Sequence, residues 1–229
     1  MRYRVFATDF DGTIATDGIL DAPTIAALQR FRSAGVICCL VTGRELGDFA
    51  NVDAVLALFD YVVAENGAVL YMPGTNELRV VAPEPPADFL AELTMRGVPI
   101  RVGKVIVATV EPHENTVLEV VKQSALELQV IFNKGAVMVL PAGVNKATGL
   151  QTILDMCGLP FADVVGAGDG ENDQVFLDHC GLSVAVANAV PGIKERAMLV
   201  TEANAGAGVV ELIDSLLADE LPSLPKGGN

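Results

Sequence analysis

The N-terminal part of the chain alternates between short apolar runs and segments with apolar residues at helical spacing. The apolar runs are typical of buried strands and comprise residues 3–8, 36–41 and 61–64. A helix over 24–31 is predicted between the first two runs, with Asp21 as its cap and Gly35 behind its end. A second helix is predicted to follow the second run and to end at about Leu58. This alternation favours right-handed crossovers and therefore an α/β fold with a doubly wound parallel sheet.

A different pattern interrupts this alternation between residues 68 and 141. A β-hairpin over 68–81 and a stiff proline-containing linker come first. The next segment predicts a small α+β unit, with helices over 88–95 and 114–126 and strands over 104–110, 128–132 and 136–140. Parallel alternation then resumes, with a helix over 146–158, a strand over 162–167, a helix to about 180, a strand over 182–186 and two further helices. The expected division is a core of residues 1–82 and 142–218, an inserted α+β domain of residues 83–141, and a disordered tail of residues 219–229.

Composition and charge narrow the class of protein. The formal net charge is −14, which argues against a nucleic-acid partner because phosphate backbones are bound by basic faces. The four cysteines form no C-x-x-C pair and the two histidines stand in no metal or nucleophile pattern, so we expect reduced thiols and no zinc site. No apolar run is long enough to cross a bilayer, which predicts a soluble, cytoplasmic protein without a membrane partner. The oligomeric state stays open.

Polar loops follow three of the predicted core strands. Asp9 and Asp11 follow the first strand, Thr42-Gly43-Arg44 follows the second, and Asp169 and Asp173 follow a later one. Since the carboxyl ends of parallel strands share one edge of the sheet, we expect these loops to form one pocket. Two acids that converge there repel each other unless a cation or a proton separates them.

Four acids in one pocket need a compensating charge. Mg²⁺ meets this need, because it typically binds a few carboxylates together with waters and substrate oxygens. A pocket without serine, histidine or cysteine leaves a carboxylate as the plausible nucleophile, and its attack on phosphorus would give an aspartyl-phosphate. Lys146 would add positive charge at the phosphoryl oxygens. These residues therefore indicate phosphoryl transfer assisted by Mg²⁺.

The same residues resemble the four ordered motifs of the haloacid dehalogenase-like phosphohydrolase superfamily, over nearly the whole chain. The motifs are Asp9-x-Asp11-Gly12-Thr13, Thr42-Gly43-Arg44, Lys146, and Gly168-Asp169-Gly170-x-Asn172-Asp173. The insert between the second and third motifs resembles the class-IIB cap of Cof-type sugar phosphatases, phosphoglycolate phosphatase, sucrose-phosphate phosphatase and phosphomannomutases. Glu65-Asn66-Gly67-Ala68 and Ala187-Asn188-Ala189 look like further marks of that branch. The resemblance implies a Rossmann-like core with a small cap domain.

The resemblance also implies different roles for the two acids of the first motif. Asp9 would be the nucleophile, while Asp11 would protonate the leaving oxygen and then activate water. Dehalogenating members lack an acid two residues after the nucleophile, so Asp11 favours phosphoryl transfer. Thr42 and Lys146 would bind the phosphate, together with backbone N–H groups near residues 10, 11 and 43.

For the metal, the resemblance implies a Mg²⁺ ion bound by oxygen atoms. Asp9, Asp169 and the backbone carbonyl of Asp11 would be its ligands. Asp173 would be a further ligand or would support the others.

Several of these residues also have purely structural interpretations. Taken alone, Lys146 would be a surface lysine and Thr42 a helix cap. Asn172 would either cap the helix after the fourth motif or take part in the reaction. Arg44 would either contact substrate or pair with a neighbouring acid, and Asn188 would either shape its turn or lie near the phosphate.

The predicted function is a Mg²⁺-dependent phosphatase that hydrolyses a small phosphorylated metabolite, either a sugar phosphate or a phosphoglycolate-like phosphomonoester. The cap would close over the site and select the substrate. Its candidate specificity residues are Arg101, Lys104, Asn133 and Lys134. Arg101 and Lys104 would either bind a second anionic group, such as the carboxylate of phosphoglycolate, or form a solvated pair on a strand edge.

Two other functions stay open. A phosphomutase shares the core and the cap, but it would need more basic cap residues than this short insert has, in order to hold either end of a bisphosphorylated sugar. A non-catalytic module that binds metal or phosphate is the second alternative. It would have no need of Asp11 beside Asp9.

Overall fold

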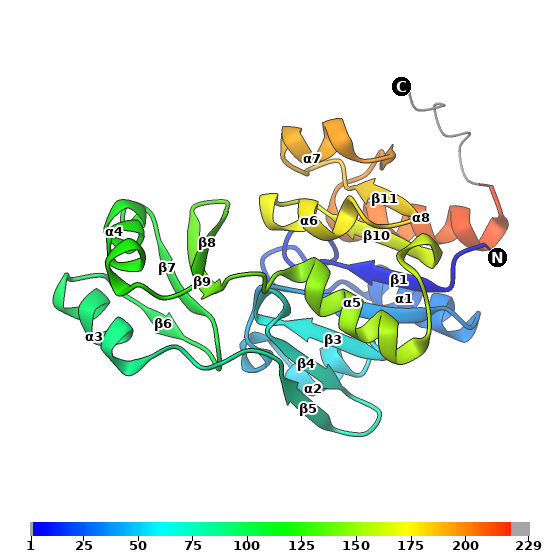
Figure 1. The fold of residues 1–229 in the computed structure, drawn as a ribbon. Helices are drawn as coiled ribbons and strands as arrows, with labels where there is room; N and C mark the ends of the chain where they lie inside the picture. Colours follow the sequence, from blue (N-terminus) through cyan, green and yellow to red (C-terminus); the bar gives the residue numbers. More distant parts are fainter. Residues whose placement is uncertain (1, 221–229) are drawn as a thin grey trace.

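Two β-sheets form the two lobes of the protein (Figure 1). The computed structural model describes residues 2–220. The strands of the larger sheet are, in spatial order, β12 (Leu199–Val200), β11 (Leu182–Ala185), β10 (Val164–Gly168), β1 (Val5–Thr8), β2 (Ile37–Val41), β3 (Tyr61–Ala64), β4 (Val69–Met72) and β5 (Glu77–Val80). The strands of the smaller sheet are, in spatial order, β6 (Arg101–Val102), β7 (Val107–Val110), β9 (Ala136–Pro141) and β8 (Leu128–Asn133).

The larger sheet is parallel from β12 to β3, which confirms the expected doubly wound α/β core. The hairpin of β4 and β5 extends it with antiparallel strands. β1 lies between β10 and β2, with Val5 opposite both Val164 and Ile37. The strand order therefore reverses direction next to β1, and ligands of open α/β sheets bind beyond the carboxyl ends at such a point.

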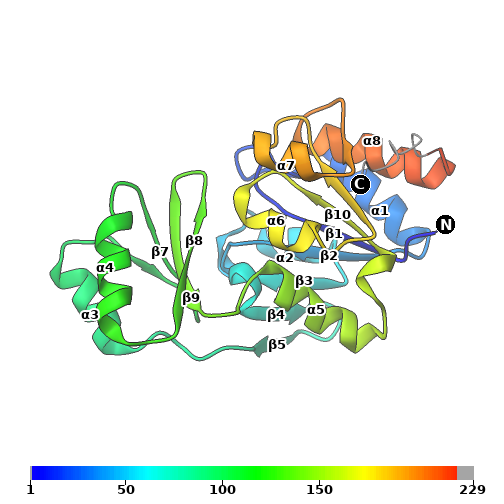
Figure 2. The ribbon, with the colours of Figure 1, turned by 45° about the horizontal axis from the view of Figure 1, so that its top comes forward.

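Helices cover both faces of the larger sheet. They are α1 (Ala22–Ser33), α2 (Val52–Leu56), α5 (Lys146–Cys157), α6 (Gln174–Leu177), α7 (Pro191–Arg196) and α8 (Ala205–Ala218). α1 packs beside α8 and α5 beside α6, and Figures 1 and 2 show these two pairs on opposite sides of the sheet. The smaller sheet carries only α3 (Ala87–Met95) and α4 (Glu114–Ser124), which lie side by side.

Each lobe has its own apolar cluster. β1 is buried along its whole length, and Phe6 packs edge-to-face on Phe31 of α1 with 5.6 Å between the ring centroids. Cys38 and Cys39 are buried in β2, within the strand that the apolar run predicted. The cluster of the smaller lobe consists of Phe89, Leu93, Val98, Val107, Val117, Val120, Val137 and Val139. The inserted segment therefore has an apolar cluster of its own, while four of its buried residues belong to the cluster of the larger lobe: Val105, Ile106, Met138 and Leu140.

Three predicted elements differ from the structure. The helix expected up to Leu58 is a 3₁₀ turn (Leu46–Asp48) followed by the short α2, because Asn51 takes a left-handed conformation (φ 55°) that interrupts it. The strand expected over 104–110 begins only at Val107, as β7, because residues 103–106 form a turn that joins it to β6. The helix expected up to residue 180 is a 3₁₀ turn (Glu171–Asp173) continued by α6, which ends at Leu177.

The chain passes between the lobes after β5 and again after β9 (Figure 1). The domain boundaries at 82/83 and 141/142 stay predictions. Most of the tail predicted to be disordered, residues 221–229, lies outside the described residues. Over residues 2–220, no helix combines the length and the apolar character that crossing a membrane requires.

Candidate active site

The polar loops expected to meet do meet at the carboxyl edge of the parallel sheet. Asp9 directly follows β1, and its N–H donates to the carbonyl of Ala167 in β10 (3.0 Å). Thr42 directly follows β2, and its N–H donates to the carbonyl of Val63 in β3 (2.8 Å). Asp169 directly follows β10. The strand register therefore brings the first, second and fourth motifs to one edge.

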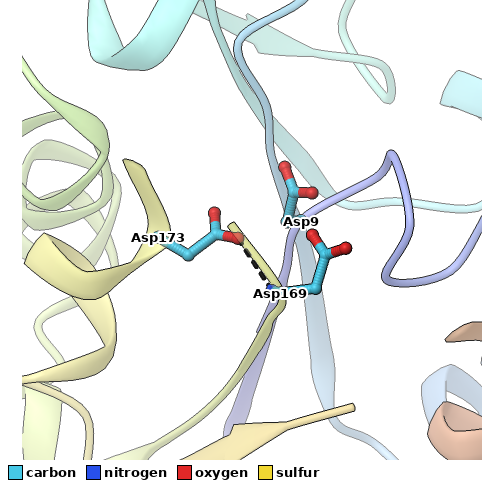
Figure 3. A group of neighbouring side chains, drawn as sticks. All are labelled: Asp9, Asp169 and Asp173. Atoms are coloured by element: carbon cyan, nitrogen blue, oxygen red, sulfur yellow. Dashed lines mark hydrogen bonds between the residues drawn. The ribbon is translucent and has the colours of Figure 1, made fainter. Parts of the chain in front are cut away.

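Three carboxylates converge at this edge (Figure 3). One oxygen of each of Asp9, Asp169 and Asp173 can be chosen so that all three lie within 4.8 Å of one another, and all three residues are buried. Burial, together with the negative charge of Asp173, raises the pKa of Asp9 from 3.8 to about 7. Burial also raises the pKa of Asp169. A buried cluster of carboxylate oxygens in which the pKa values of Asp9 and Asp169 are raised fits a hard divalent cation, because such a cation would stabilise the ionised forms that burial disfavours.

Lys146 compensates part of this negative charge. It is the first residue of α5, and its Nζ lies 2.5 Å from Oδ1 of Asp9 and 2.6 Å from Oδ1 of Asp173. Only 1% of Lys146 is exposed. The interpretation of Lys146 as a surface lysine, which its sequence position alone would suggest, is therefore wrong. Burial favours its neutral form, but Asp173 and Asp9 outweigh that effect and raise the pKa of the ammonium group.

Asp173 and Asn188 hold the loop that carries Asp169. Oδ2 of Asp173 accepts hydrogen bonds from the N–H groups of Asp169 and Gly170, both at 2.9 Å. Since its other oxygen binds Lys146, Asp173 links the third and fourth motifs. Nδ2 of Asn188 donates to the carbonyl of Gly12 (2.7 Å) and to Oδ2 of Asp169 (3.3 Å). Asn188 therefore joins the first and fourth motifs.

Asp11 is not part of the three-carboxylate cluster and pairs with Arg44. The guanidinium donates from Nε and Nη2 to the two carboxylate oxygens, both at 2.6 Å, and from Nη1 to the carbonyl of Asp48 at 2.7 Å. Of the two interpretations of Arg44, the structure shows the pairing with a neighbouring acid. Thr42 accepts a hydrogen bond from the N–H of Arg44 (3.1 Å), so its hydroxyl shapes this loop and caps no α-helix.

Comparison with known proteins adds to this geometry. The family model of the haloacid dehalogenase-like hydrolases matches residues 6–94 and 98–213. The chain belongs to this family.

Individual relatives agree with the assignment. The protein is 32% identical to the phosphoglycolate phosphatase of Methanothermobacter thermautotrophicus over 92% of this chain and 97% of that one. Two solved structures share its fold. One, from Thermoplasma acidophilum, has a TM-score of 0.81 and 17% identity over 95% and 99% of the two chains. The other, a sugar phosphatase of subclass IIB, has a TM-score of 0.78 and 19% identity over 93% and 98%. These matches bear out the predicted class, a phosphoric monoester hydrolase of the haloacid dehalogenase-like superfamily with a subclass-IIB fold.

In this haloacid dehalogenase-like hydrolase, a cavity of about 220 Å³ lies between the lobes. Asp9, Asp11, Thr42, Gly43, Arg44 and Asn172 line it from the core, and Arg101, Ile106, Ala108, Asn133, Ala136 and Met138 line it from the smaller lobe. Of the four polar candidates in the insert, Arg101 and Asn133 line the cavity. Lys104 has an exposed side chain and is not among the lining residues.

Lys134 makes a contact that the sequence did not predict. It lies in the turn between β8 and β9, and its ammonium group pairs with Oδ2 of Asp169. Its N–H donates to Glu171 (3.1 Å). The turn of the β8–β9 hairpin therefore contacts the fourth motif.

Asn172 does not cap α6. Its Nδ2 donates to Oδ1 of Asn66 (3.0 Å), a fully buried residue that directly follows Glu65. Asn66 and Glu65 both have positive φ angles, 52° and 48°. The sequence singled out this pair only as part of a family pattern. Charged and polar side chains directly behind an apolar strand were the signal that could have marked them as site residues.

Proposed function

We propose that the protein is a Mg²⁺-dependent phosphatase that cleaves a small phosphomonoester through a phosphorylated Asp9. One observation carries the proposal: the carboxylate of Asp9 lines the cavity between the lobes while lying in hydrogen-bond contact with buried Lys146. An attacking carboxylate needs a neighbouring cation because two anions must approach each other. The relatives named as phosphatases support the same reaction.

The first half of the reaction uses both acids of the first motif. An oxygen of Asp9 attacks phosphorus, the bond to the leaving oxygen breaks, and Asp11 supplies the proton that this oxygen takes up. Asp11 must be protonated and must leave Arg44 for this step, since the carboxylate bound to the guanidinium carries no proton to give. Lys146, Thr42 and nearby backbone N–H groups would hold the phosphoryl oxygens.

The second half restores Asp9. Asp11 accepts a proton from water as the water oxygen attacks phosphorus, and the bond between phosphorus and Asp9 breaks. Inorganic phosphate then leaves, and once Asp11 has released its proton to solvent, its carboxylate can pair with Arg44 again. The lobe that carries Arg101 and Asn133 limits the access of bulk water to the cavity during these steps.

Asp9, Asp169 and the backbone carbonyl of Asp11 would hold the Mg²⁺ ion, with Asp173 binding it or orienting its ligands. The ion would offset the charge of the phosphoryl oxygens and of the attacking carboxylate. The buried cluster of carboxylate oxygens, in which the pKa values of Asp9 and Asp169 are raised, supports this choice over a soft metal.

As substrate we propose 2-phosphoglycolate or a phosphomonoester of similar size with a second anionic group. The cavity is small, about 220 Å³, and Arg101 reaches it from the insert. The phosphoglycolate phosphatases among the relatives support the same substrate class. Of the basic insert residues, only Arg101 lines the cavity, which gives little support for the two-ended binding that a phosphomutase requires.

The test is phosphate release from 2-phosphoglycolate, hexose phosphates and acetyl phosphate, each with Mg²⁺ and with EDTA. We expect turnover that depends on Mg²⁺ and the highest kcat/KM for 2-phosphoglycolate. Asp9→Asn should abolish turnover while it leaves the circular dichroism spectrum unchanged. Normal turnover by this variant would remove Asp9 from the role of nucleophile.

A further inference from the structure

A buried carboxylate of the core binds a backbone turn of the smaller lobe. Oε1 of Glu65 accepts a hydrogen bond from the N–H of Lys104 (3.0 Å). Oε2 accepts from the N–H groups of Val105 (2.8 Å) and Ile106 (3.0 Å). Three consecutive backbone donors thus converge on one side chain. We call this contact, between Glu65 and residues 104–106, the clasp.

The N–H groups of residues 104–106 are the electrostatic partners of Glu65. The residue is 2% exposed, and within residues 2–220 no ion pair joins it to a lysine or an arginine. A carboxylate buried without a cation is stabilised by the N–H dipoles that point at it. The three donors belong to the insert, so the insert supplies the hydrogen bonds that this buried core residue needs.

Two features show that the local structure accommodates this contact. Glu65 has a φ of 48°, a conformation that non-glycine residues adopt rarely. A Cβ atom at Gly103 would lie 2.8 Å from Cδ of Glu65, so the turn approaches the carboxylate as closely as it does because residue 103 is a glycine. The N–H of Gly103 also donates to the carbonyl of Ile106 (2.9 Å), which closes the turn.

The clasp connects the two halves of the cavity. On the core side, the N–H of Glu65 donates to the carbonyl of Arg44 (3.0 Å), which lies in the loop of the second motif. On the insert side, the turn joins β6 to β7, and Ile106 in the turn and Ala108 in β7 both line the cavity. Arg101 lies in β6, just before the turn, and its Nη2 reaches Asp48 of the core at 2.7 Å.

We propose that Glu65 is a positioning residue: its carboxylate fixes the β6–β7 turn of the insert against the core and thereby places Arg101 and Ile106 over the phosphate site. The inference rests on the proposed function only where activity is the readout. The clasp brings together groups that recognise the part of the substrate beyond the phosphate. Within residues 2–220, no hydrogen bond or ion pair links the clasp to the side chain of Asp9 or Lys146, so the clasp acts on substrate selection and leaves phosphate binding to the core.

The first experiment measures amide hydrogen exchange by NMR in the full-length protein and in Glu65→Gln. The glutamine amide has one acceptor oxygen in place of two, so it cannot accept all three hydrogen bonds. We expect the amides of residues 104–106 to exchange about tenfold faster in the variant, while those of β7 change by less than about twofold. Unchanged exchange at residues 104–106 would overturn the clasp.

A second variant covers the case in which Glu65→Gln fails to fold. Gly103→Ala keeps the carboxylate but pushes it away from the turn, and we expect the same selective increase in exchange. The matched control is Asp60→Asn, because Asp60 also accepts a backbone hydrogen bond, from Cys38 at 2.9 Å, but lies away from the insert. It should leave the amides of residues 104–106 unchanged. Exchange that rises equally in the control and in both variants would show a general loss of stability and would overturn the assignment.

The second experiment compares two substrates of nearly equal size. 2-Phosphoglycolate ends in a carboxylate, and acetyl phosphate ends in a methyl group. We expect Glu65→Gln to lower kcat/KM for 2-phosphoglycolate about tenfold and that for acetyl phosphate by less than about threefold, since only the first uses the groups that the clasp places. Equal losses on both substrates would overturn the positioning role. A wild-type protein that cleaves neither substrate would contradict the proposed function, while the exchange experiment would still decide the clasp.

Discussion

Nζ of Lys146 lies 2.5 Å from Oδ1 of Asp9 and joins the first turn of α5 to the end of β1. The two residues are 137 positions apart in the sequence, and the inserted lobe lies between them in the chain. The folding of the core around the insert therefore assembles the charge pair on which the proposed reaction depends.

Replacing this lysine should affect both activity and stability. In Lys146→Met, Asp9 and Asp173 lose their shared cation while they stay buried. We expect kcat/KM to fall by a factor on the order of 100 or more, and the free energy of unfolding of the metal-free protein to fall by about 3 kcal/mol. Phosphate-release kinetics and urea denaturation measure the two effects. Lys122→Met, at an exposed position on α4, is the matched control and should change neither quantity.

Asp9 should make the stability of the metal-free protein depend on pH. Burial, with the charge of Asp173, raises its pKa from 3.8 to about 7, so the folded chain holds a proton that the unfolded chain has lost between these values. The stability contribution is complete below about pH 4 and is lost as the pH rises through about 7. The raised pKa of Asp169 acts in the same direction.

Thermal unfolding in EDTA between pH 5 and pH 8 tests this expectation. Tm should fall with rising pH in the wild type and should fall less in Asp9→Asn, which has no carboxylate at this position. Mg²⁺ should raise Tm more at pH 8 than at pH 5, because it binds the ionised carboxylates. Identical pH profiles for the wild type and Asp9→Asn would contradict the assignment of the effect to Asp9.

Much of the core and most of the site residues could be predicted from the sequence. Apart from Thr8, the residues of β1, β2 and β3 are hydrophobic, and parallel strands bring their ends together, so the meeting of Asp9 with Asp169 follows from the pattern. The break at Asn51 could not be predicted in the same way, since its left-handed conformation depends on tertiary context.

The contacts between the lobes could not be predicted from the sequence, for a related reason. Lys134 and Glu65 meet their partners across the boundary between the two lobes. The periodicity of apolar residues predicts the helices and strands within each lobe. It does not predict how one lobe packs against the other. A lysine in a hairpin turn is expected to be a solvated charge until its neighbour across that boundary is known, and here the neighbour is Asp169.

Gly12 allows the first motif to approach the fourth. It has a φ of +79°, and a Cβ atom there would lie 2.2 Å from Oδ2 of Asp169. Gly35 has a similar φ, +84°, but a Cβ atom there would meet nothing within 4 Å beyond its chain neighbours, so it is a matched control for backbone strain. Both alanine variants should lose about 1–2 kcal/mol of stability from the left-handed conformation. Only Gly12→Ala should also weaken Mg²⁺ binding, measured by calorimetry, because the new methyl group displaces the carboxylate.

Lys134 and a divalent cation would compete for the same oxygen of Asp169. The ammonium group pairs with Oδ2 in the metal-free protein, and 40% of the lysine side chain is exposed, so the pair contributes modestly. We therefore expect Lys134→Met to bind Mg²⁺ about two- to fivefold more tightly than the wild type, measured by isothermal titration calorimetry without substrate. Lys104→Met is the control: this lysine is also exposed on the insert, but its side chain forms no ion pair within residues 2–220, so its Mg²⁺ affinity should equal that of the wild type. Weaker Mg²⁺ binding in Lys134→Met would show that the lysine supports the metal site, and competition for Asp169 would then be the wrong account of the contact.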